Sequence, residues 1–301
     1  MRGKRSATPL WMSFRKKRQT EGCRTSKAPS PLRSAGAPQI FMKLENRLAL
    51  ITGGGRGIGR AIAFAFAREG ASIAVAARTR AQVESVAYEV ACEFGVETLA
   101  VECDVADAES VGRAFAHTSE QFGGGPDILV NNAGIAETYP FVKTDEAMWQ
   151  RHLEVNLTGT FRCTRLALPG MLEHGWGRVI NIASIAGKTG APYISAYSAS
   201  KHGVLGLTRS LALEVGATGI TVNAICPGYV DTEMTSRGIE NIVAKTGKSA
   251  DDALAVLKRA SPQNRLVTGE EVAALALLLA SEDGRGINGQ AINVDGGTVL
   301  F

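Results

Sequence analysis

The chain alternates between short apolar runs and longer amphipathic segments. Seven short runs are almost wholly apolar, and we predict strands over 48–52, 72–77, 98–102, 128–131, 179–183, 221–225 and 291–294. The segments between them have helical spacing, and we predict helices over 58–69, 80–94, 107–122, 145–173, 196–216 and 268–281. The pattern therefore predicts an α/β protein.

The order of these elements also predicts how they are arranged. Strands that alternate with helices of this length form a parallel sheet, here of seven strands, with helices on both faces. Nearly continuous apolar strands fit a sheet that is covered on both sides. Right-handed crossovers then give the doubly wound Rossmann fold, in which ligands bind at the carboxyl ends of the strands. We expect a single domain over 42–301.

One segment, 230–266, interrupts the alternation. It contains the patterns of two short helices, near 236–246 and 250–259. Because the segment follows a strand, at the edge of the sheet where ligands bind, we expect it to cover the site as a substrate lid. A surface insertion without a role in the site is the alternative.

Charge is distributed unevenly along the chain. Residues 1–41 hold ten Lys or Arg and one acidic residue, whereas the other 23 Lys and Arg are outnumbered by 28 Asp and Glu. The net charge of +4 therefore gives no indication that the folded part binds nucleic acid. The segment 1–41 is rich in Ser, Thr and Pro and lacks apolar periodicity, so we expect a disordered basic N-terminal extension.

Three interpretations of this extension remain open. Its Arg- and Ser-rich composition is typical of an organelle transit peptide. Its basic run at 15–18 is typical of a targeting or binding tail. In the interpretation that we favour, the reading frame begins at Met42, directly before the first strand.

The cysteines and the apolar runs bear on the protein's location. Five cysteines, widely spaced and without a CxxC pair, favour a reducing compartment over a disulfide framework or a metal site. No run reaches the roughly eighteen apolar residues that a membrane-spanning helix needs. We expect a cytoplasmic protein, with organelle import as the alternative if the extension is real.

A glycine-rich turn, TGGGRGIG over 52–59, follows the first predicted strand. Gly53, Gly57 and Gly59 allow a tight turn and let a pyrophosphate approach the backbone, since no Cβ is in the way. The helix that begins near Ile58 directs its free N–H groups at the phosphates. The spacing differs from GxGxxG, so this motif alone is a weak signal.

Two arginines favour NADP(H) over NAD(H). The second strand ends in VAARTR, without the acidic residue that binds a ribose 2′-hydroxyl. Arg78 at that end and Arg56 inside the glycine turn are suited to bind a 2′-phosphate together. NAD(H) is the alternative if one of these arginines faces solvent.

Tyr197 and Lys201 lie four residues apart in the sequence YSASK, which places them on one side of a helix. On most helices such a pair is a surface feature. Together with a nucleotide-binding turn, however, a phenol whose pKa is lowered by a nearby ammonium is suited to give a proton to a carbonyl. The pair therefore predicts nicotinamide redox chemistry on a carbonyl or an alcohol.

These motifs belong to an ordered set. The glycine turn is followed by NNAG at 131–134, Asn156, Ser184 thirteen residues before Tyr197, the YxxxK pair and Pro227-Gly228. On this set, the chain resembles the short-chain dehydrogenase/reductase family from about residue 43 to 297. Five motifs in order make the resemblance specific.

The resemblance implies a catalytic tetrad. In it Tyr197 is the acid/base, and Lys201 lowers the pKa of Tyr197 and binds the nicotinamide ribose. Ser184 donates to the substrate oxygen, and Asn156 holds a water that links Lys201 to solvent. We expect the nearby His152 to be a packed residue and not an acid–base group.

The resemblance also implies contacts with the cofactor. Asp104, which would otherwise be interpreted as a helix N-cap, is expected at the adenine, and Thr232 at the nicotinamide carboxamide. Asn131, Ala133 and Gly134 are expected beneath the ribose. The full set of expected cofactor-binding residues is Thr52, Gly53, Arg56, Gly57, Ile58, Gly59, Arg78, Asp104, Val105, Asn131, Ala133, Gly134, Tyr197, Lys201, Pro227, Gly228, Val230 and Thr232. No metal is implied.

The family implies a small-molecule carbonyl or alcohol as substrate without fixing which one. The segments 197–204, 218–223 and 226–228 are most similar to 3-oxoacyl thioester reductases, 3-hydroxybutyrate-type dehydrogenases and polyketide ketoreductases. Reductases that act on acyl carrier protein place basic residues near Gly175 and Thr218, which are uncharged here. This favours a CoA ester or a small ketone, with a polyol, steroid or cyclic alcohol as the alternative. We expect Tyr193 to help shape the pocket, and a homotetramer by analogy.

Two other classes of protein fit parts of the sequence. A non-catalytic nucleotide-binding protein would have a damaged tetrad, whereas all four residues are present. A nucleic-acid binder acting through the basic extension would require residues 1–41 in the mature protein, which mass spectrometry of native material tests. We expect neither a nucleic-acid partner nor a membrane partner.

Overall fold

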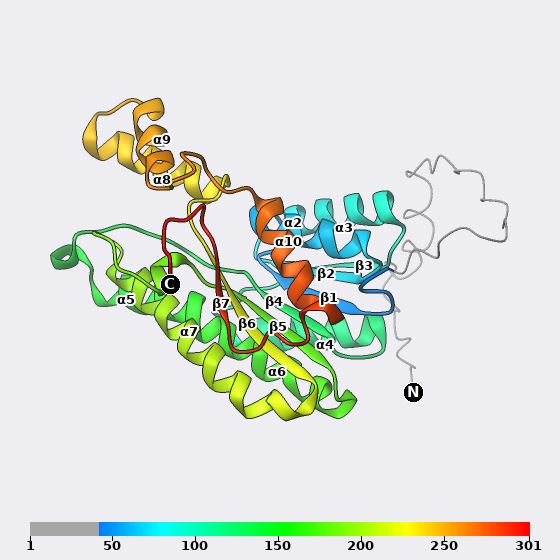
Figure 1. Cartoon of the computed structure of the whole chain (residues 1–301). Helices are drawn as coiled ribbons and strands as arrows, with labels where there is room; N and C mark the ends of the chain where they lie inside the picture. The colour runs from blue at the N-terminus through cyan, green and yellow to red at the C-terminus, as the bar shows by residue number, and fades with distance from the viewer. Residues whose placement is uncertain (1–41) are drawn as a thin grey trace, which may run out of the picture. The chain divides into compact units, whose positions relative to one another are not determined.

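The computed structural model describes residues 42–301, and the expected basic extension lies outside this range. Figure 1 shows a parallel sheet between two layers of helices. Its strands are β1 (Leu48–Thr52), β2 (Ser72–Ala77), β3 (Thr98–Glu102), β4 (Ile128–Asn131), β5 (Gly177–Ile182), β6 (Ile220–Pro227) and β7 (Ala291–Val294). The order β3-β2-β1-β4-β5-β6-β7 confirms the doubly wound α/β fold.

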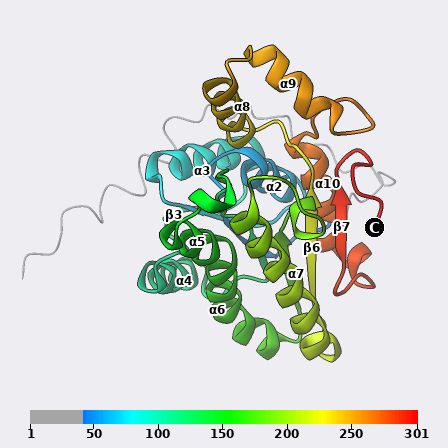
Figure 2. The same ribbon diagram turned by 90° about the vertical axis from the view of Figure 1, so that its left-hand side faces the viewer.

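Within residues 42–301, three helices pack on each face of the sheet (Figures 1 and 2). One face carries α2 (Gly57–Arg68), α3 (Arg80–Phe94) and α10 (Gly269–Ala280), and the other carries α4 (Ala108–Phe122), α6 (Gly159–His174) and α7 (Ser195–Val215). Phe66 of α2 and Met171 of α6 are almost completely buried in the two cores. Each large apolar side chain buried in this way contributes about 1.5–3 kcal/mol.

The predicted helix over 145–173 is interrupted. The structure has α5 (Glu146–Leu153), a π-helical turn (Glu154–Thr158) and then α6. At the junction Gly159 packs against Val105, where an added Cβ would lie 2.9 Å from the Val105 Cβ. A single π-helical turn adds only one residue to a long helix, so the apolar periodicity of the sequence does not reveal it.

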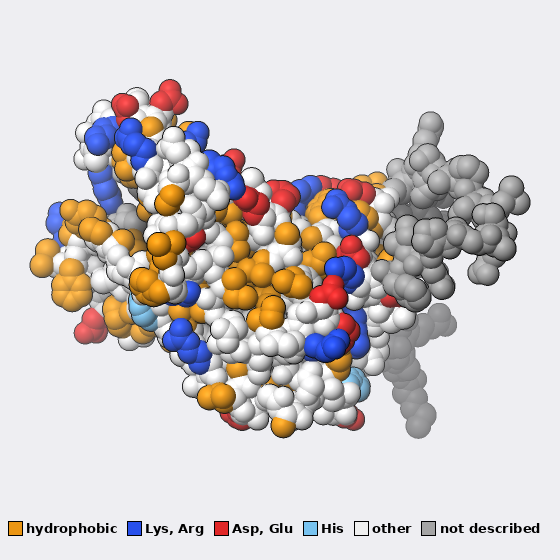
Figure 3. Space-filling model, viewed as in Figure 1, with side chains coloured by type: hydrophobic (Ala, Val, Ile, Leu, Met, Phe, Trp, Pro, Cys, Tyr) orange, Lys and Arg blue, Asp and Glu red, His pale blue; other side chains and the backbone are white. Residues whose placement is uncertain are grey.

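The segment between β6 and α10 projects from the sheet as two helices, α8 (Glu233–Thr246) and α9 (Ala250–Arg259), as Figures 1 and 2 show. No residue of α8 is buried, and in α9 only Ala253 and Leu257 are. Figure 3 shows Lys and Arg side chains mixed with Asp and Glu over this part. The segment therefore adds little to the hydrophobic core.

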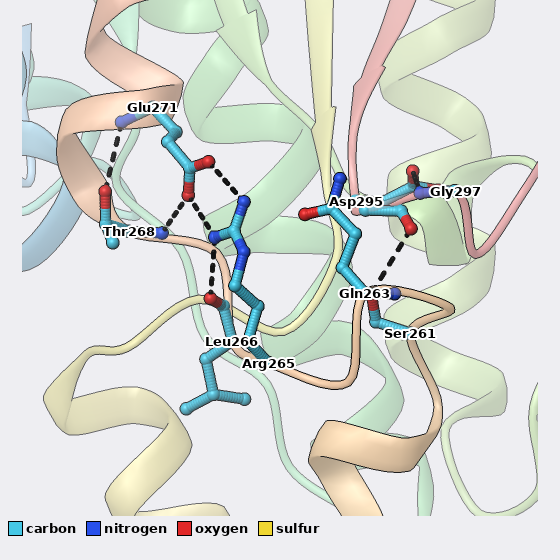
Figure 4. Close-up of polar contacts among 9 residues, drawn as sticks. Ser261, Gln263, Arg265, Leu266, Thr268, Glu271, Asp295 and Gly297 are labelled. Atoms are coloured by element: carbon cyan, nitrogen blue, oxygen red, sulfur yellow. Dashed lines mark hydrogen bonds and ion pairs between the residues drawn. The ribbon is translucent and has the colours of Figure 1, made fainter.

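The base of this segment is fastened to the body by polar contacts. Val230 and Val267 form a parallel bridge, in which the Asp231 N–H donates to the Val267 carbonyl at 2.8 Å. Beyond it, the Arg265 guanidinium donates two 2.7 Å hydrogen bonds to the Glu271 carboxylate (Figure 4). Thr268 and Glu271 also form the capping box that begins α10. The two ends of the segment are thus held together, while its helices extend outward.

The hydropathy of the helices and the state of the cysteines both refer to the described part of the chain. Between residues 42 and 301, no helix is long and apolar enough to cross a membrane. Cys103, Cys163 and Cys226 are buried free thiols, and Cys92 is not free. Burial raises the pKa of Cys103 to about 11 and that of Cys163 to about 12, so these two stay protonated at neutral pH.

Candidate active site

A cavity of about 480 Å³ lies at the carboxyl ends of the strands. It is lined by the segments that follow β1 to β6 and by residues of α8 and α9. This is the place that the doubly wound fold predicts for a ligand. We call the part formed by the segments after β1 to β4 the cofactor end, and the part formed by the segments after β5 and β6 together with α8 and α9 the substrate end, after the ligands that the sequence analysis predicts for them.

The glycine turn forms one wall of the cofactor end. Gly53 has φ of +63°, and a Cβ there would lie 2.8 Å from the Asn132 Nδ2 and 2.9 Å from the Ala133 Cα. A Cβ on Gly59 would lie 2.4 Å from the Gly53 carbonyl oxygen. The turn therefore requires glycine, and its bare backbone beside the start of α2 fits the pyrophosphate of a dinucleotide.

Thr52 and Asn132 hold this turn in place. The buried Thr52 hydroxyl accepts hydrogen bonds from the N–H groups of Asn132 (3.0 Å) and Ala133 (3.1 Å). In return, the Asn132 Nδ2 donates to the carbonyls of Thr52 (2.9 Å) and Gly53 (3.0 Å). The ends of β1 and β4 are thereby joined behind the cofactor end of the cavity.

Asn131 does not lie where we expected it. Its Nδ2 donates to the Thr164 hydroxyl at 3.0 Å and to the Asn181 Oδ1 at 2.9 Å, inside the core. Asn131 is not among the residues that line the cavity, whereas Asn132 is. Thr52, Gly59 and Asn156 likewise lie behind the cavity wall. Asn132 is therefore a site residue that the motif NNAG contained and that the expected set left out.

The two arginines differ in their partners. Both line the cavity, but the Arg56 guanidinium forms an ion pair with Glu233, the first residue of α8. Arg78 is exposed and forms no ion pair with any residue between 42 and 301. No sequence pattern indicated the Arg56–Glu233 pair, which joins positions 177 residues apart.

Asp104 also lines the cofactor end. Its Oδ1 accepts a hydrogen bond from the Ala106 N–H at 3.0 Å. The residue that caps α4 is Asp107, whose side chain accepts from the Glu109 N–H at 2.9 Å, so the N-cap interpretation of Asp104 is wrong. The remaining expected cofactor residues that line the cavity are Gly57, Ile58, Val105, Ala133, Gly134, Pro227, Gly228, Val230 and Thr232.

Three of the four expected catalytic side chains line the same cavity, namely Ser184, Tyr197 and Lys201. Ser184 follows β5, and its hydroxyl accepts from the Ala186 N–H at 3.0 Å. Tyr197 lies in the first turn of α7, with Lys201 one turn later. The Lys201 Nζ is buried, lies 5.9 Å from the centre of the Tyr197 ring and donates to the Ile182 carbonyl at 2.8 Å.

Asn156 lies in the π-helical turn and is buried. Its Oδ1 accepts from the Ile135 N–H at 2.9 Å, and its Nδ2 donates to the Ile135 carbonyl and to the Ser200 hydroxyl, both at 3.0 Å. A Cβ on Gly134 would lie 3.1 Å from the Asn156 Oδ1 and 3.6 Å from the Lys201 Nζ. Asn156 therefore fixes the backbone after β4 close to Lys201.

The pKa values of Tyr197 and Lys201 are both shifted by burial. Burial raises the pKa of Tyr197, and a hydrogen bond with Ser184 acts in the opposite direction. Burial also lowers the pKa of Lys201 to about 8. Desolvation dominates at the phenol, and the Lys201 Nζ is hydrogen-bonded to the Ile182 carbonyl, so the lowering of the Tyr197 pKa by Lys201 beside a bound nicotinamide stays a prediction. The phenol is protonated at neutral pH, as a proton donor must be.

Two further expectations have opposite outcomes. His152 is packed, as expected: its Nε2 accepts from the Glu137 N–H at 3.2 Å, and its Nδ1 lies 2.8 Å from the Met148 carbonyl oxygen. Tyr193 was expected at the pocket, but it is 64% exposed and does not line the cavity. Its φ of +69° lies in the left-handed region, two residues before α7 begins.

The substrate end of the cavity is mostly apolar and uncharged. Its apolar lining residues include Ile185, Ile194, Tyr229, Met234, Ile242 and Leu257. Among the lining residues from β5 onward, Lys201 and Glu233 alone are charged. Lys201 lies beside Tyr197 and donates to the Ile182 carbonyl, and Glu233 pairs with Arg56, so the lining residues of α8 and α9 offer no cation to an anionic substrate.

Comparison with known proteins extends these observations. A family model described as Enoyl-(Acyl carrier protein) reductase matches residues 53–299. The D-beta-hydroxybutyrate dehydrogenase of Rhizobium meliloti (strain 1021) is 38% identical over 253 residues, which are 83% of this chain and 98% of that protein. The 3-oxoacyl-(acyl-carrier-protein) reductase FabG of Aquifex aeolicus (strain VF5) is 38% identical over 256 residues, or 85% of this chain and 98% of that protein.

A solved structure gives the same result. A variant of the actinorhodin polyketide ketoreductase, solved with NADPH, is 38% identical and superposes with a TM-score of 0.81, covering 85% of this chain and 98% of its own. The similarity extends over nearly the whole length of these proteins. It includes both the sheet that carries the glycine turn and the helix that carries Tyr197 and Lys201.

Proposed function

The chain belongs to the short-chain dehydrogenase/reductase family of oxidoreductases, and we propose that it interconverts a ketone and a secondary alcohol with NADP(H). The observation that carries the proposal is that Ser184, Tyr197 and Lys201 line one cavity together with a glycine turn that fits a dinucleotide. A protonated phenol, a hydroxyl and an ammonium beside a nucleotide cradle suit carbonyl reduction.

The proposed roles follow from the contacts of each side chain. The nicotinamide, when bound, supplies or accepts the hydride. Tyr197 donates its phenolic proton to the carbonyl oxygen in reduction and takes it back in oxidation, and Ser184 donates a hydrogen bond to the same oxygen. Lys201 binds the ribose and stabilises the phenolate. Asn156 positions the backbone of Gly134 and Ile135 below the reacting groups.

NADP(H) is proposed over NAD(H) because of the charges at the cofactor end. Arg56 and Arg78 both line the cavity, and β2 is followed by no acidic residue that would bind a ribose 2′-hydroxyl. The related ketoreductase is described with NADPH, which supports this choice.

The proposed substrate is a 3-oxoacyl thioester or a similar small ketone. Relatives named as 3-oxoacyl reductase, D-beta-hydroxybutyrate dehydrogenase and polyketide ketoreductase support a carbonyl next to an acyl chain or ring. The uncharged substrate end favours a neutral ester or ketone over a free carboxylate, because a carboxylate would be desolvated there without a cation. A polyol, steroid or cyclic alcohol is the second candidate, and the apolar lining suits the ring of the last two.

The segment 230–266 is proposed as the substrate lid of a catalytic domain over 42–301. Its residues Met234, Ile242 and Leu257 line the substrate end, which supports the proposal. A homotetramer is proposed by analogy with the family, and light scattering of the purified protein tests it.

NADPH oxidation with acetoacetyl-CoA tests the proposal, with NADH as the second cofactor and Tyr197→Phe as the control. We expect NADPH-dependent turnover that falls by roughly 100-fold or more in Tyr197→Phe, because the proton donor is lost. NADPH binding should be retained in the variant. Turnover with NADH alone would contradict the cofactor choice, and turnover of polyols or cyclic ketones alone would favour the second candidate.

A further inference from the structure

The lid brings a carboxylate to the cofactor end of the cavity. Glu233 is the first residue of α8, and its carboxylate contacts the Arg56 guanidinium. Its other oxygen accepts a 2.7 Å hydrogen bond from the Arg237 Nη2, one turn further along α8. Arg56 and Glu233 both line the cavity. Glu233 is thus the one acidic residue of the lid that reaches the cofactor-binding wall in the described chain.

This contact occupies the same guanidinium that the proposed function assigns to the 2′-phosphate. Arg78, the second cation of that site, forms no ion pair within residues 42–301. A 2′-phosphate that approaches Arg56 must displace the Glu233 carboxylate and then remain close to its negative charge. The 2′-hydroxyl of NAD(H) is uncharged, so it neither displaces the Glu233 carboxylate nor is repelled by its charge. The contact therefore acts differently on the two cofactors.

We propose that Glu233 is a specificity-determining residue that competes with the 2′-phosphate for Arg56 and thereby reduces the preference for NADP(H) over NAD(H). The inference rests on the proposed function, since it presupposes a nicotinamide cofactor in this cavity. It assigns to the first turn of the lid a part in selecting the cofactor. When the 2′-phosphate of NADP(H) displaces Glu233 from Arg56, α8 also loses its contact with the glycine turn.

A structural role for Glu233 must be separated from this competition. An acidic residue in the first turn stabilises a helix through the helix dipole, whatever its partner. Glu240 offers a matched control, because it lies on α8, is exposed and forms no ion pair with the described residues. Glu240→Gln changes the charge of the lid by the same amount as Glu233→Gln without touching Arg56.

The experiment is calorimetric titration of the cofactor-free protein with NADPH and with NADH, for wild type, Glu233→Gln and Glu240→Gln. We expect Glu233→Gln to lower the Kd for NADPH by roughly threefold to tenfold. This corresponds to the free energy of one exposed ion pair, that of Arg56 with Glu233, plus the repulsion between Glu233 and the 2′-phosphate. The Kd for NADH should stay within twofold, and Glu240→Gln should leave both constants unchanged. Glu233→Ala serves as the second variant and should give the same selective change.

A double-mutant cycle tests whether the effect passes through Arg56. In an Arg56→Gln background, Glu233→Gln should change the Kd for NADPH by less than twofold. An unchanged NADPH-to-NADH ratio in Glu233→Gln, an equal gain for both cofactors, or an undiminished effect without Arg56 would each overturn the inference while leaving the proposed function intact. If wild type binds neither cofactor, the proposed function fails and the inference fails with it.

Discussion

The two ends of the cavity are built in different ways. The cofactor end is formed by segments that leave buried strands, and a network of hydrogen bonds from Thr52 and Asn132 fixes it. The substrate end depends on α8 and α9, which bury only Ala253 and Leu257. Apart from its base, the lid is joined to the body by a few polar contacts such as Arg56–Glu233 and Lys245–Thr138.

This difference shows how one scaffold separates two requirements. Positioning a cofactor needs a backbone that does not move, and packing in the core provides it. Admitting a substrate needs an element with a low free-energy cost of opening, and the proposed lid, a pair of helices with few buried contacts, is suited to that. The predictions below are arranged to test this contrast, from the largest expected effect to the smallest.

Adding one methyl group at the cofactor end and one in the lid should show most clearly how the two ends of the cavity differ. Gly59→Ala places a Cβ 2.4 Å from the Gly53 carbonyl oxygen, so we expect a loss of about 3 kcal/mol in unfolding free energy, the upper range for overpacking. Gly238→Ala in α8 meets nothing within 4 Å and should increase helix stability by roughly 0.5–1 kcal/mol. Urea unfolding measures the first effect and hydrogen exchange of the α8 amides the second. Equal tolerance of both changes would show that the cofactor end is as adaptable as the lid.

The charge of the substrate tests the apolar substrate end. Acetoacetate and its methyl ester differ little in size but only the first is an anion, and we expect kcat/KM to be at least roughly tenfold higher for the ester. Met234→Lys should raise turnover of acetoacetate by supplying a cation at the lid, while Met234→Gln should not. Equal use of acid and ester by wild type would mean that a cation does serve this end.

The pH dependence of stability tests the burial of Lys201. Because its pKa is lowered to about 8, the folded protein loses this proton at a lower pH than the unfolded chain, in which a lysine titrates near 10.4. The unfolded state therefore binds more protons above pH 8, and this group makes stability rise by about 1 kcal/mol between pH 7 and pH 9.

Urea unfolding of wild type and Lys201→Met at both pH values isolates that contribution. The variant lacks the titrating group, so the difference between the two proteins cancels the effect of the cysteines, whose thiols titrate in this pH range in the unfolded chain. A difference that does not change with pH would contradict the lowered pKa.

The smallest effect is expected at the contact between the lid and the loop after β4. The Lys245 Nζ donates to the Thr138 carbonyl at 3.0 Å and lies 5.4 Å from the centre of the Tyr139 ring. Lys245→Met should raise the KM for the ketone by roughly twofold to threefold, the value of one exposed polar contact, and leave the Kd for NADPH unchanged. Lys248→Met, which removes a lid charge without such a contact, is the control. A change in NADPH binding would show that the two ends are coupled.

Most of the fold followed from the apolar pattern, because strands buried on both faces are continuous apolar runs. The exceptions have local causes. Asn131 and Asn132 are consecutive, and neighbouring residues at the end of a strand face opposite sides, so only the register of β4 decides which one reaches the cavity. The Arg56–Glu233 pair depends on the placement of the lid, which no local pattern encodes.

The exposed apolar residues near the lid are a second feature that the sequence pattern does not predict. Figure 3 shows hydrophobic side chains gathered at the end of the molecule where α5 lies. Phe141 and Val142, which precede α5, are exposed by 75% and 91%. The apolar residues of this stretch are indistinguishable by type from those of the core, and tertiary placement alone shows that they face outward.

The π-helical turn at Glu154–Thr158 has a consequence for comparing and redesigning this chain. Such a turn contains one residue more than the α-helical turn it replaces, so α5 and α6 are equivalent to a single rod with an inserted residue. Deleting one residue there would convert the π-helical turn into an α-helical one, which changes the direction of the side chains within the turn and leaves α5 and α6 in register. Asn156 would then lose its alignment with Ile135 although every side chain kept its identity. The effect of the extra residue is confined to the turn, and an alignment that places a gap within 154–158 changes which residue contacts Ile135.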